Sequence, residues 1–481
     1  MRGFKERLAR EGRLVEIERA VSSKYEVASV CAELERRGNK KPVFFHAVDG
    51  RHKVLTNVLG GRERLAELLG LGTAASAEVA PFLAKVAEGG RGGGSEGEGE
   101  GAREGEGAGE REVKIVEDSP TREVVSKEPD LSELPILTHF HGDGGAYITA
   151  GVVVAELDGV RNASFHRMMV LDAKRLAVRL VPPRHLYKMH REAVERGEEL
   201  KVGIAIGVEP LVLLAAATRV PPGKEFEYAA ALKTLSLEKK GLPKKNESVE
   251  LFRLSNGVAV PHAEFALEGF LGEERAREGP FLDLTGTYDC VREEPVLRLT
   301  KIYHRKDPIY HAILPAGAEH KLLMGVPYEP LIFRAVERVA RVKNVFLTDG
   351  GCCYLHAVVQ IKKEGKGGEG EGEGVAKNAI ISALAAHPSL KLVVVVDTDI
   401  DLFNPAEVEY ALATRVRWSE DLVLIPGAKG SSLDPSSRNG LTTKIGIDAT
   451  KETGRGEEVG GGEEAGGGEE AAKKYERVVT T

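Results

Sequence analysis

Two carboxylates on a short loop are the residues of this sequence best suited to acid–base chemistry. In the segment Glu278-Gly-Pro-Phe-Leu-Asp283, the Gly-Pro pair forces an irregular backbone between the two acidic side chains. Carboxylates held on a loop beside the apolar Phe-Leu pair can work as general acids. A second interpretation stays open for this segment taken alone, namely a loop whose carboxylates accept hydrogen bonds from backbone amides.

A second segment, Asn162-Ala-Ser-Phe-His-Arg167, offers an amide oxygen and a guanidinium five residues apart. On a regularly alternating strand, positions 162 and 167 face opposite sides of the sheet. A bulge or a turn must therefore intervene if the two side chains are to converge on one site. Taken alone, the pattern is also typical of a surface asparagine and a salt-bridged arginine.

A third segment, Arg179-Leu-Val-Pro-Pro-Arg-His185, carries groups that can bind phosphate or metal. The two prolines end a strand, so they place Arg184 and His185 where the next helix begins. Side chains and free amides at such a junction can bind phosphate, and histidine is a common metal ligand. The alternative is a turn with a solvated arginine.

A fourth segment, Pro221-Pro-Gly-Lys-Glu-Phe-Glu-Tyr228, begins a helix with two carboxylates, Glu225 and Glu227. Glutamates early in a helix usually complement its dipole. One of them could instead supply a hard oxygen ligand for Mn²⁺ or Mg²⁺.

Hydrophobic periodicity predicts the elements that must position these four segments. The C-terminal part alternates strands with helices, which favours an α/β domain with a partly parallel sheet. Its valine-rich strand reads as buried on both faces. Predicted strands lie at 41–48, 146–157, 165–181, 200–208, 342–350 and 390–401, and predicted helices at 4–12, 26–38, 375–387 and 405–416.

Three tracts rich in Gly and Glu divide the chain, and their low apolar content predicts loops or tails rather than packed structure. The resulting prediction is a mixed α/β (α+β) fold in several parts. These parts are an N-terminal α/β unit at 1–88, a flexible loop at 89–115, a central β-rich domain at 116–320, a C-terminal α/β domain at 321–450 with a loop insertion at 364–374, and a flexible tail at 451–481.

Composition narrows the class of protein. The net charge of −7 over 481 residues argues against a large nucleic-acid surface, which needs a basic stripe. The four cysteines are too few and too irregularly spaced for a disulfide framework or a paired-CxxC zinc site. The charged N-terminus has no secretory signal, and no apolar run is long enough to cross a bilayer, so we expect a cytoplasmic protein without a transmembrane segment.

Taken together, the four segments occur in the order and approximate spacing of the UbiD-type decarboxylases. The chain resembles that family from about residue 4 to about residue 450, and four separated motifs in the right order are a specific signal. The stretches that carry the resemblance are LAREGRLVEIERAVSSKYEVASV, NVLGGRERLAELLG, NASFHRMMVLDAKRLAVRLVPPRHL, EGPFLDLTGTY, VVVDTDIDLFNPAEVEYALATRV, LDPSS and KIGIDAT.

The resemblance implies that a central split β-barrel domain binds prenylated flavin mononucleotide (FMN), a divalent metal that is usually Mn²⁺, and often K⁺. Matching the motifs assigns the metal to Asn162, Glu225 and His185. Glu227 is a weaker match for the glutamate ligand. The residues implied to line the flavin are Phe165, His166, Arg167, Arg179, Leu180, Val181, Arg184 and His185.

The resemblance also implies the catalytic roles. Glu278 would form an ion pair with Arg167 that positions the substrate, and Asp283 would be the proton donor. Arg167 would hold the carboxylate of an α,β-unsaturated or aromatic acid, CO₂ would leave as electrons move into the flavin, and Asp283 would protonate the vacated carbon. A flavin prenyltransferase would supply the cofactor, and the family forms homodimers or homohexamers.

The expected substrate follows from the similarity to archaeal members of the family. Several of these convert trans-anhydromevalonate 5-phosphate to isopentenyl phosphate in an archaeal mevalonate pathway. An alternative is a 4-hydroxybenzoate-type decarboxylase of polyprenylated aromatic acids. Two further alternatives are a non-catalytic flavin-binding or scaffold paralogue and an ordinary flavin oxidoreductase. For the oxidoreductase, the sequence offers no GxGxxG after a strand as a nicotinamide site.

Overall fold

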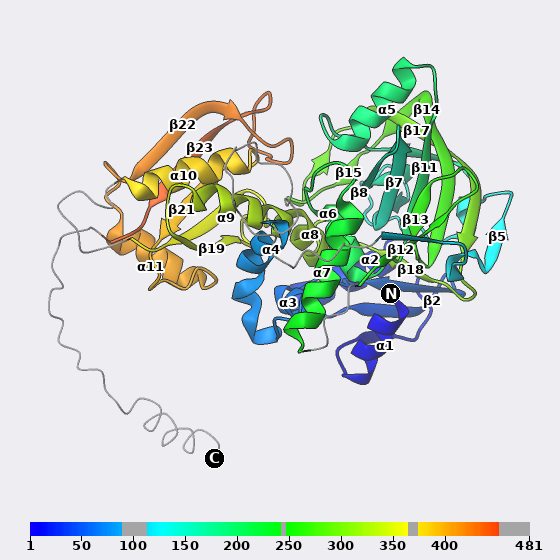
Figure 1. Ribbon diagram of the computed structural model, residues 1–481, viewed down its shortest axis with the longest axis horizontal. Coiled ribbons are helices and arrows are strands. Elements are labelled where there is room, and N and C mark those ends of the chain that lie inside the picture. The colour runs from blue at the N-terminus through cyan, green and yellow to red at the C-terminus, as the bar shows by residue number, and fades with distance from the viewer. Residues whose placement is uncertain (89–112, 242–246, 364–373, 452–481) are drawn as a thin grey trace, which may run out of the picture.

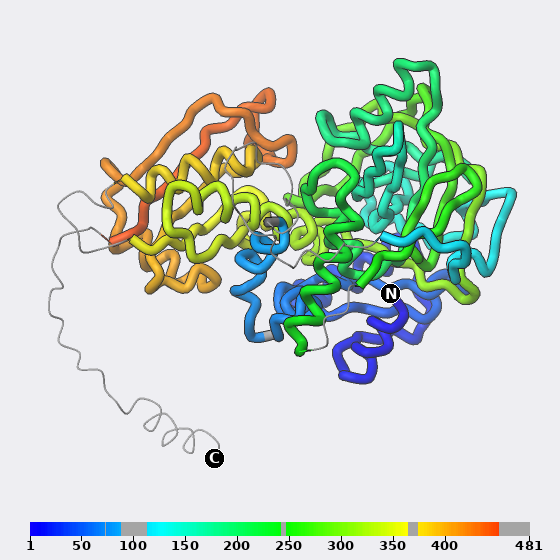
Figure 2. Tube along the Cα trace, in the orientation of Figure 1, coloured from blue at the N-terminus to red at the C-terminus, as the bar shows by residue number. Residues whose placement is uncertain are grey.

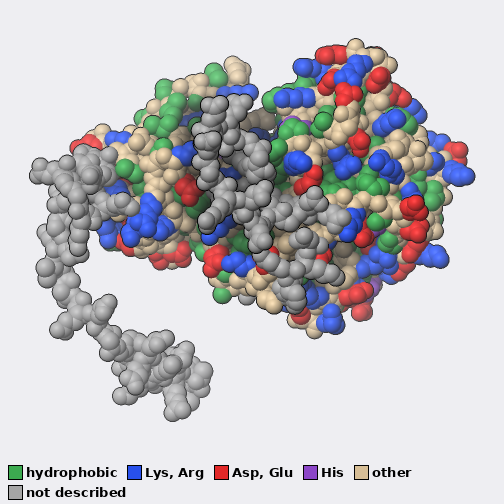
Figure 3. All heavy atoms as spheres, in the orientation of Figure 1, with side chains coloured by type: hydrophobic (Ala, Val, Ile, Leu, Met, Phe, Trp, Pro, Cys, Tyr) green, Lys and Arg blue, Asp and Glu red, His purple; other side chains and the backbone are tan. Residues whose placement is uncertain are grey.

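The computed structural model describes residues 1–88, 113–241, 247–363 and 374–451. Figure 1 shows two lobes side by side, with the N-terminal unit beneath the larger one. The larger lobe is built on the central strands, and the smaller lobe contains the C-terminal α/β domain. On the face shown in Figure 3, acidic and basic side chains are interspersed rather than gathered into a basic stripe.

The N-terminal unit contains a four-stranded sheet that is completed by a strand from much later in the chain. Its order is β1-β2-β3-β18, and Ile309 of β18 pairs in parallel with Lys53 of β3. The chain therefore returns to the N-terminal sheet after it has built the central one. The elements are α1 (Arg2–Arg10), β1 (Val15–Ile17), α2 (Glu26–Arg36), β2 (Val43–Val48), β3 (His52–Thr56), α3 (Arg62–Leu68), α4 (Val79–Glu88) and β18 (Ile309–Ala312).

The central lobe is built on a nine-stranded sheet whose main path is β6-β9-β10-β17-β14-β11-β7-β8, with β5 paired to β17. Alternation along β7 places Val152 and Val154 in one hydrophobic core and Val153 in another. Helices α6 and α7 contribute to the first core and α5 to the second, so each face of the sheet is covered. These strands are β5 (Val124–Ser126), β6 (Tyr147–Ile148), β7 (Gly151–Leu157), β8 (Val160–Phe165), β9 (Met168–Val170), β10 (Arg175–Val178), β11 (Leu200–Ile206), β14 (Phe265–Glu278) and β17 (Arg292–His304), and the helices are α5 (His185–Glu195), α6 (Pro210–Ala217) and α7 (Glu225–Lys239).

Two smaller sheets lie beside the central one. A three-stranded sheet has the order β13-β12-β4, and a two-stranded hairpin is formed by β15 and β16. The hairpin directly follows the long strand β14, and it carries part of the candidate site. The bounds are β4 (Val113–Val116), β12 (Val249–Arg253), β13 (Ala259–Pro261), β15 (Phe281–Leu282) and β16 (Tyr288–Asp289).

The C-terminal lobe has a mixed five-stranded sheet of order β19-β20-β21-β23-β22. Strand β21 pairs in parallel with both of its neighbours, which confirms the predicted partly parallel sheet. Val393 and Val394 are both fully buried but belong to different hydrophobic clusters, so this strand is indeed buried on both faces. The elements are α8 (Ala318–Gly325), α9 (Glu329–Glu337), β19 (Val342–Leu347), β20 (His356–Ile361), α10 (Val375–Ala386), β21 (Leu392–Val396), α11 (Pro405–Arg415), β22 (Leu422–Lys429) and β23 (Leu441–Asp448).

The N-terminal unit also packs against both lobes. Helix α4 packs against α9 and β19, and Figure 2 shows this part of the chain reaching the smaller lobe. The buried Glu329 receives both Nη groups of Arg62, at 2.8 and 2.6 Å. A near-buried bidentate pair of this kind fixes orientation as well as adding energy.

The predicted mixed α/β fold is confirmed. The single strand predicted at 165–181 is wrong, because this segment turns back on itself and forms the antiparallel strands β9 and β10. Other predicted elements differ mainly at their ends. Residues 113–115, at the end of the predicted 89–115 loop, lie in β4 because they pair in parallel with β12. Gly374 caps α10, and Lys451 pairs with Asp399 at 2.8 Å. The remaining residues of the three Gly/Glu tracts lie outside the described ranges. Within those ranges, no helix has both the length and the apolar content to span a bilayer.

Candidate active site

Arg167 is the centre of the candidate site, and three carboxylates surround its guanidinium. Its Nε and Nη2 donate to the two oxygens of Glu278, each at 2.9 Å. Its Nη1 donates to Asp283 at 2.7 Å, and Nη2 donates also to Asp289 at 2.9 Å. The side chain of Arg167 is 10% exposed and that of Glu278 is fully buried. Burial lowers the pKa of Arg167, but Glu278 and the two aspartates outweigh it and raise that pKa above its usual value.

A break between two strands brings Arg167 to this place. Strand β8 ends at Phe165 and β9 begins at Met168, so His166 and Arg167 lie in the irregular connection that convergence requires. From the other side, β14 ends at Glu278, and the chain passes through Gly279-Pro280 into the hairpin of β15 and β16. The guanidinium carbon of Arg167 lies 4.8 Å from the centre of the Phe281 ring. The Phe281 ring thus packs against the arginine.

A chain of hydrogen bonds orients the polar side chains that precede Arg167. The amide Nδ2 of Asn162 donates to Ser164 Oγ at 2.8 Å, and Ser164 lies 3.0 Å from His166 Nε2. His166 Nδ1 donates to the backbone oxygen of Arg179 at 2.9 Å. Because a carbonyl can only accept, Nδ1 carries the proton and Nε2 accepts from Ser164. Among the described residues, the Oδ1 of Asn162 accepts no hydrogen bond.

Burial keeps this chain in one protonation state. His166 is 6% exposed, and burial lowers its pKa to about 4 even though the bond to Arg179 opposes the shift. The imidazole is therefore neutral at pH 7 and acts as a fixed link between two strands. Phe165, which is partly buried, packs against the first hydrophobic core.

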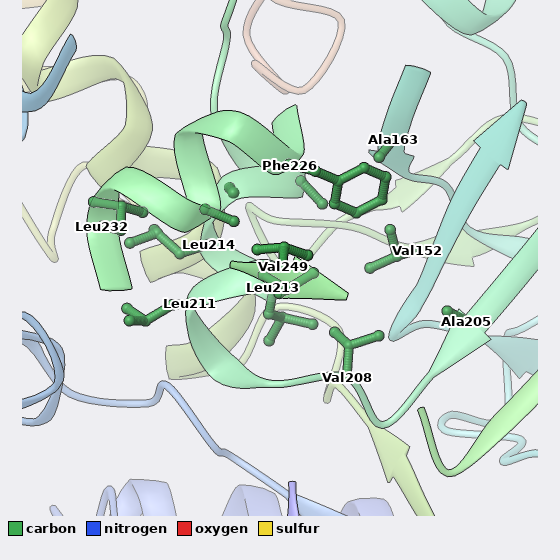
Figure 4. Packing of buried hydrophobic residues seen from close by; sticks show 14 of the residues in the cluster. Val152, Ala163, Ala205, Val208, Leu211, Leu213, Leu214, Phe226, Leu232 and Val249 are labelled. Carbon is green, nitrogen blue, oxygen red and sulfur yellow. The ribbon is translucent and has the colours of Figure 1, made fainter. Parts of the chain in front are cut away.

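Glu225 lies beside the strand that carries Asn162. It opens α7, is 5% exposed, and lies close enough to the backbone of Ala163 for that backbone to act on the pKa of its carboxyl group. Figure 4 shows Phe226 of α7 pointing toward Ala163 of β8, which fixes the start of the helix against the strand. Burial raises the pKa of Glu225 to about 7. A buried carboxylate in this position is suited to a cation partner.

The other glutamate of the segment, Glu227, differs from Glu225 in its surroundings. It is partly exposed and pairs with Lys224 at 3.3 Å. His185 is the first residue of α5, a helix that packs against β8, and burial lowers its pKa. Within the described ranges, no cluster of three His, Cys, Asp or Glu side chains suited to a metal is found. The predicted ligand set contains only two residues of these types, Glu225 and His185, and its third member is the amide of Asn162.

Some of the residues predicted to line the flavin already have hydrogen-bond partners within the protein, and others are exposed. Arg179 has such a partner, because its Nη1 donates to the buried Glu294 at 2.6 Å. The same glutamate accepts from the backbone of the buried Leu180 at 3.2 Å. Val181 accepts from the amide of Arg184, which is exposed at the N-cap of α5. Arg184 also acts on the pKa of His166, so the turn lies near the end of β8.

Two residues near Arg167 were missed by sequence reasoning. Asp289 pairs with Phe281 across the hairpin, so both side chains lie on the same face as Asp283. A hairpin predicted over residues 281–289, with its turn at Gly286, would have placed Asp289 opposite Phe281. His320, in the first turn of α8, accepts from the Ala316 amide through Nδ1 at 3.1 Å. Burial lowers its pKa, and Asp283 and Arg167 act on it, but nothing local in the sequence indicates this.

The sequence matches three domain families in chain order. Residues 5–80 match the 3-octaprenyl-4-hydroxybenzoate carboxy-lyase N-terminal domain, residues 114–318 its Rift-related domain, and residues 321–449 its C-terminal domain. The chain is 51% identical over 452 residues to the anhydromevalonate phosphate decarboxylase of Methanosarcina mazei, and the match covers 94% of this chain and 96% of that one.

Solved structures show the same similarity. The UbiD-class enzyme HmfF from Pelotomaculum thermopropionicum, in complex with FMN, matches with a TM-score of 0.83 at 33% identity over 98% of both chains. An evolved dimeric form of HmfF, in complex with prFMN, matches with a TM-score of 0.78 at 33% identity over 94% of both. With its domains in the same order and half of its residues shared with a full-length relative, this chain belongs to the UbiD family of carboxy-lyases.

Proposed function

We propose that this chain is a prenylated-FMN-dependent decarboxylase that converts trans-anhydromevalonate 5-phosphate to isopentenyl phosphate and CO₂ in a mevalonate pathway. The observation that carries the proposal is the contact of Arg167 with both Glu278 and Asp283 in a single, largely buried site. The relative from Methanosarcina mazei, which carries the name of this activity, supports the choice of substrate. That substrate is a 2-enoic acid, so it presents a carboxylate next to a double bond.

The side chains divide the work of the reaction between them. Arg167 binds the substrate carboxylate, and Glu278 fixes the plane of the guanidinium from its buried side. The bond between the carboxylate and carbon 2 breaks, and CO₂ leaves. Prenylated FMN, when bound, supplies the acceptor for the electron pair left behind. Asp283 then gives its proton to carbon 2 and recovers one from solvent.

A divalent cation, Mn²⁺ in our proposal, would be held by Asn162, Glu225 and His185, and the proposal includes K⁺ as a second cation. The oriented Oδ1 of Asn162 and the buried carboxylate of Glu225 fit such a cation, since both are hard oxygen ligands. The charge of the cation would offset the negative charge of a flavin phosphate. Phe165, His166 and the turn from Arg179 to His185 would then border the cofactor.

The phosphate of the substrate needs cationic partners, and Arg219 and Arg184 are the candidates. Both are exposed, and in the described part of the chain neither forms an ion pair with a carboxylate. The guanidinium of Arg219 lies 4.8 Å from the ring centre of Tyr328, at the start of the C-terminal lobe. Burial raises the pKa of Tyr328, and Arg219 and Arg184 partly offset that rise, so both lie near this ring.

The remaining proposals concern the setting of the enzyme. We propose a cytoplasmic homodimer or homohexamer that receives its cofactor from a flavin prenyltransferase and has no nucleic-acid partner. The net charge of −7 and the interspersed surface charges support the last point. Mass determination of the purified protein in solution tests the assembly.

The experiment that tests the function is an assay of the protein co-expressed with a flavin prenyltransferase. The absorbance spectrum should show bound flavin, and trans-anhydromevalonate 5-phosphate should yield isopentenyl phosphate. 4-Hydroxybenzoate, offered under the same conditions, should not react. Bound flavin with turnover of 4-hydroxybenzoate alone would favour the aromatic-acid alternative, and a protein without flavin would favour a scaffold.

A further inference from the structure

The hydrogen-bond capacity of Arg167 is almost used up by the three carboxylates. A guanidinium has five N–H groups, and four of them are occupied here. Glu278 takes one on Nε and one on Nη2, at 2.9 Å each. Asp289 takes the second N–H of Nη2 at 2.9 Å, and Asp283 takes one of Nη1 at 2.7 Å. With respect to the described residues, one N–H, on Nη1, is left for a substrate carboxylate.

Asp289 is the aspartate that cannot readily leave. Its Oδ2 lies 2.6 Å from Arg292 as well as 2.9 Å from Arg167, and its Oδ1 accepts from the Cys290 amide at 2.9 Å. Its side chain is 10% exposed. Burial raises the pKa of Asp289, but Arg292 and Arg167 outweigh that and hold the pKa below its ordinary value. Asp289 therefore stays ionised between two arginines.

Asp283 is held less firmly. Its Oδ2 contacts Arg167, and among the described residues its Oδ1 accepts only from the amide of the next residue, Leu284, at 2.7 Å. Its side chain has no second arginine among the described residues and is 15% exposed. A substrate carboxylate that needs both N–H groups of Nη1 can displace Asp283 more easily than either of the other two acids.

We propose that Asp289 is a positioning residue that holds the guanidinium of Arg167 so that Nη1 alone is presented to the substrate carboxylate. Glu278 and Asp289 together fix Nε and Nη2, and the arriving carboxylate takes Nη1 from Asp283. Substrate binding thus frees Asp283 from Arg167 at the time when its proton is needed. This inference rests on the proposed function, because it requires a carboxylate substrate at Arg167.

The consequence for the reaction is an ordered use of the three acids. Once displaced from Arg167, the Asp283 carboxylate takes up a proton from solvent, and this proton passes to carbon 2 after the bond to the carboxylate has broken. Once CO₂ has left, Nη1 is free again, and the deprotonated Asp283 can return to it. Asp289 and Glu278 stay in place through the whole cycle, and neither exchanges a proton.

The test compares Asp289→Asn with the wild type, both loaded with prenylated flavin. Asparagine keeps the shape of the side chain but removes the charge that two arginines share. We expect KM to rise roughly 10- to 100-fold, as for other charge-assisted contacts, with a smaller fall in kcat. The flavin spectrum should be unchanged, which a general loss of folding would not allow. Asp172→Asn, which removes a carboxylate from the exposed pair with Arg175, is the matched control.

A crystal structure of the flavin-loaded Asp289→Asn variant provides the second readout. The expected result is a guanidinium of Arg167 rotated away from its two contacts with Glu278. An unchanged Arg167 together with an unchanged KM would overturn the proposal. If the wild type binds flavin but does not turn over the phosphorylated acid, the proposed function fails, and the position of Arg167 in the variant still decides the role of Asp289.

Discussion

Arg167 and Glu278 meet through two parallel hydrogen bonds, Nε to Oε1 and Nη2 to Oε2, both at 2.9 Å. The two residues are 111 positions apart in the chain, and one ends the connection after β8 while the other ends β14. Since Glu278 is fully buried, the pair sets the plane in which Arg167 can receive a carboxylate.

Replacement of Glu278 by Gln should both destabilise the protein and slow its turnover of substrate. The variant leaves the buried guanidinium with one fewer charge partner, so the free energy of unfolding should fall by about 3 kcal/mol. Turnover should fall roughly 100-fold, because a misplaced binding group costs about that much. Denaturant unfolding and steady-state kinetics measure the two effects. Glu293→Gln, at an exposed neighbouring position, serves as control, and an equal loss in both variants would refute the assignment.

Metal binding distinguishes Glu225 from Glu227. Glu225→Gln should weaken Mn²⁺ binding roughly 10- to 100-fold, because it replaces a buried carboxylate with a neutral amide. Glu227→Gln should leave affinity near the wild-type value, since this partly exposed glutamate pairs with Lys224. Titration of metal into metal-free protein, followed by calorimetry, gives both affinities. The opposite ranking would transfer the ligand role to Glu227.

Binding of the substrate through its phosphate should depend on Arg219. We expect Arg219→Gln to raise KM for trans-anhydromevalonate 5-phosphate roughly 10-fold, since it removes one charge-assisted contact at an exposed position. Flavin content should stay constant. Arg338→Gln, at another exposed arginine, is the control. Loss of flavin with an unchanged KM would instead assign Arg219 to the phosphate of the cofactor.

Acid should destabilise the fold through its buried histidines. Burial lowers the pKa of His139 from 6.5 to about 3, so between these values only the unfolded chain binds the proton. The stabilisation is fully present above pH 6.5 and is lost as the pH falls toward 3. For His139 alone, the free energy of unfolding should drop by about 2 kcal/mol between pH 7 and pH 5. Burial also lowers the pKa values of His166, His356 and His387.

The variant His139→Leu tests this directly by denaturant unfolding at both pH values. Its stability should change less between pH 7 and pH 5 than that of the wild type. His141→Leu, two residues away but exposed, should keep the wild-type pH dependence. If His139→Leu kept it too, the buried imidazole would not be a source of acid sensitivity.

The parts of the fold that depend on local pattern could be predicted from the sequence. The strand with the valine run at 393–396 and the helices beside it follow from periodicity. The two helices end within one residue of their predicted ends, whereas the strand predicted at 390–401 covers only 392–396. The need for a break between positions 162 and 167 followed from strand geometry alone. By contrast, the pairing of β18 with β3 joins residues more than 250 positions apart, and no local signal specifies such a partner.

In the candidate site, too, residues in a local motif could be predicted, whereas residues placed by tertiary pairing could not. Glu278 and Asp283 could be selected because their motif is short and irregular. Asp289 could not, because its role depends on the register of the hairpin that pairs it with Phe281. The orientation of Asn162 depends likewise on Ser164, whose hydroxyl looks ordinary in the sequence.

The activity of Asp283→Asn, with its flavin content measured in the same preparation, tests the central claim most directly. Asparagine can still accept from Arg167 but has no acidic proton to deliver to carbon 2. We predict full flavin binding and no release of isopentenyl phosphate from trans-anhydromevalonate 5-phosphate. A flavin-loaded variant that retains most of the wild-type turnover would contradict the assignment of Asp283 as the acid.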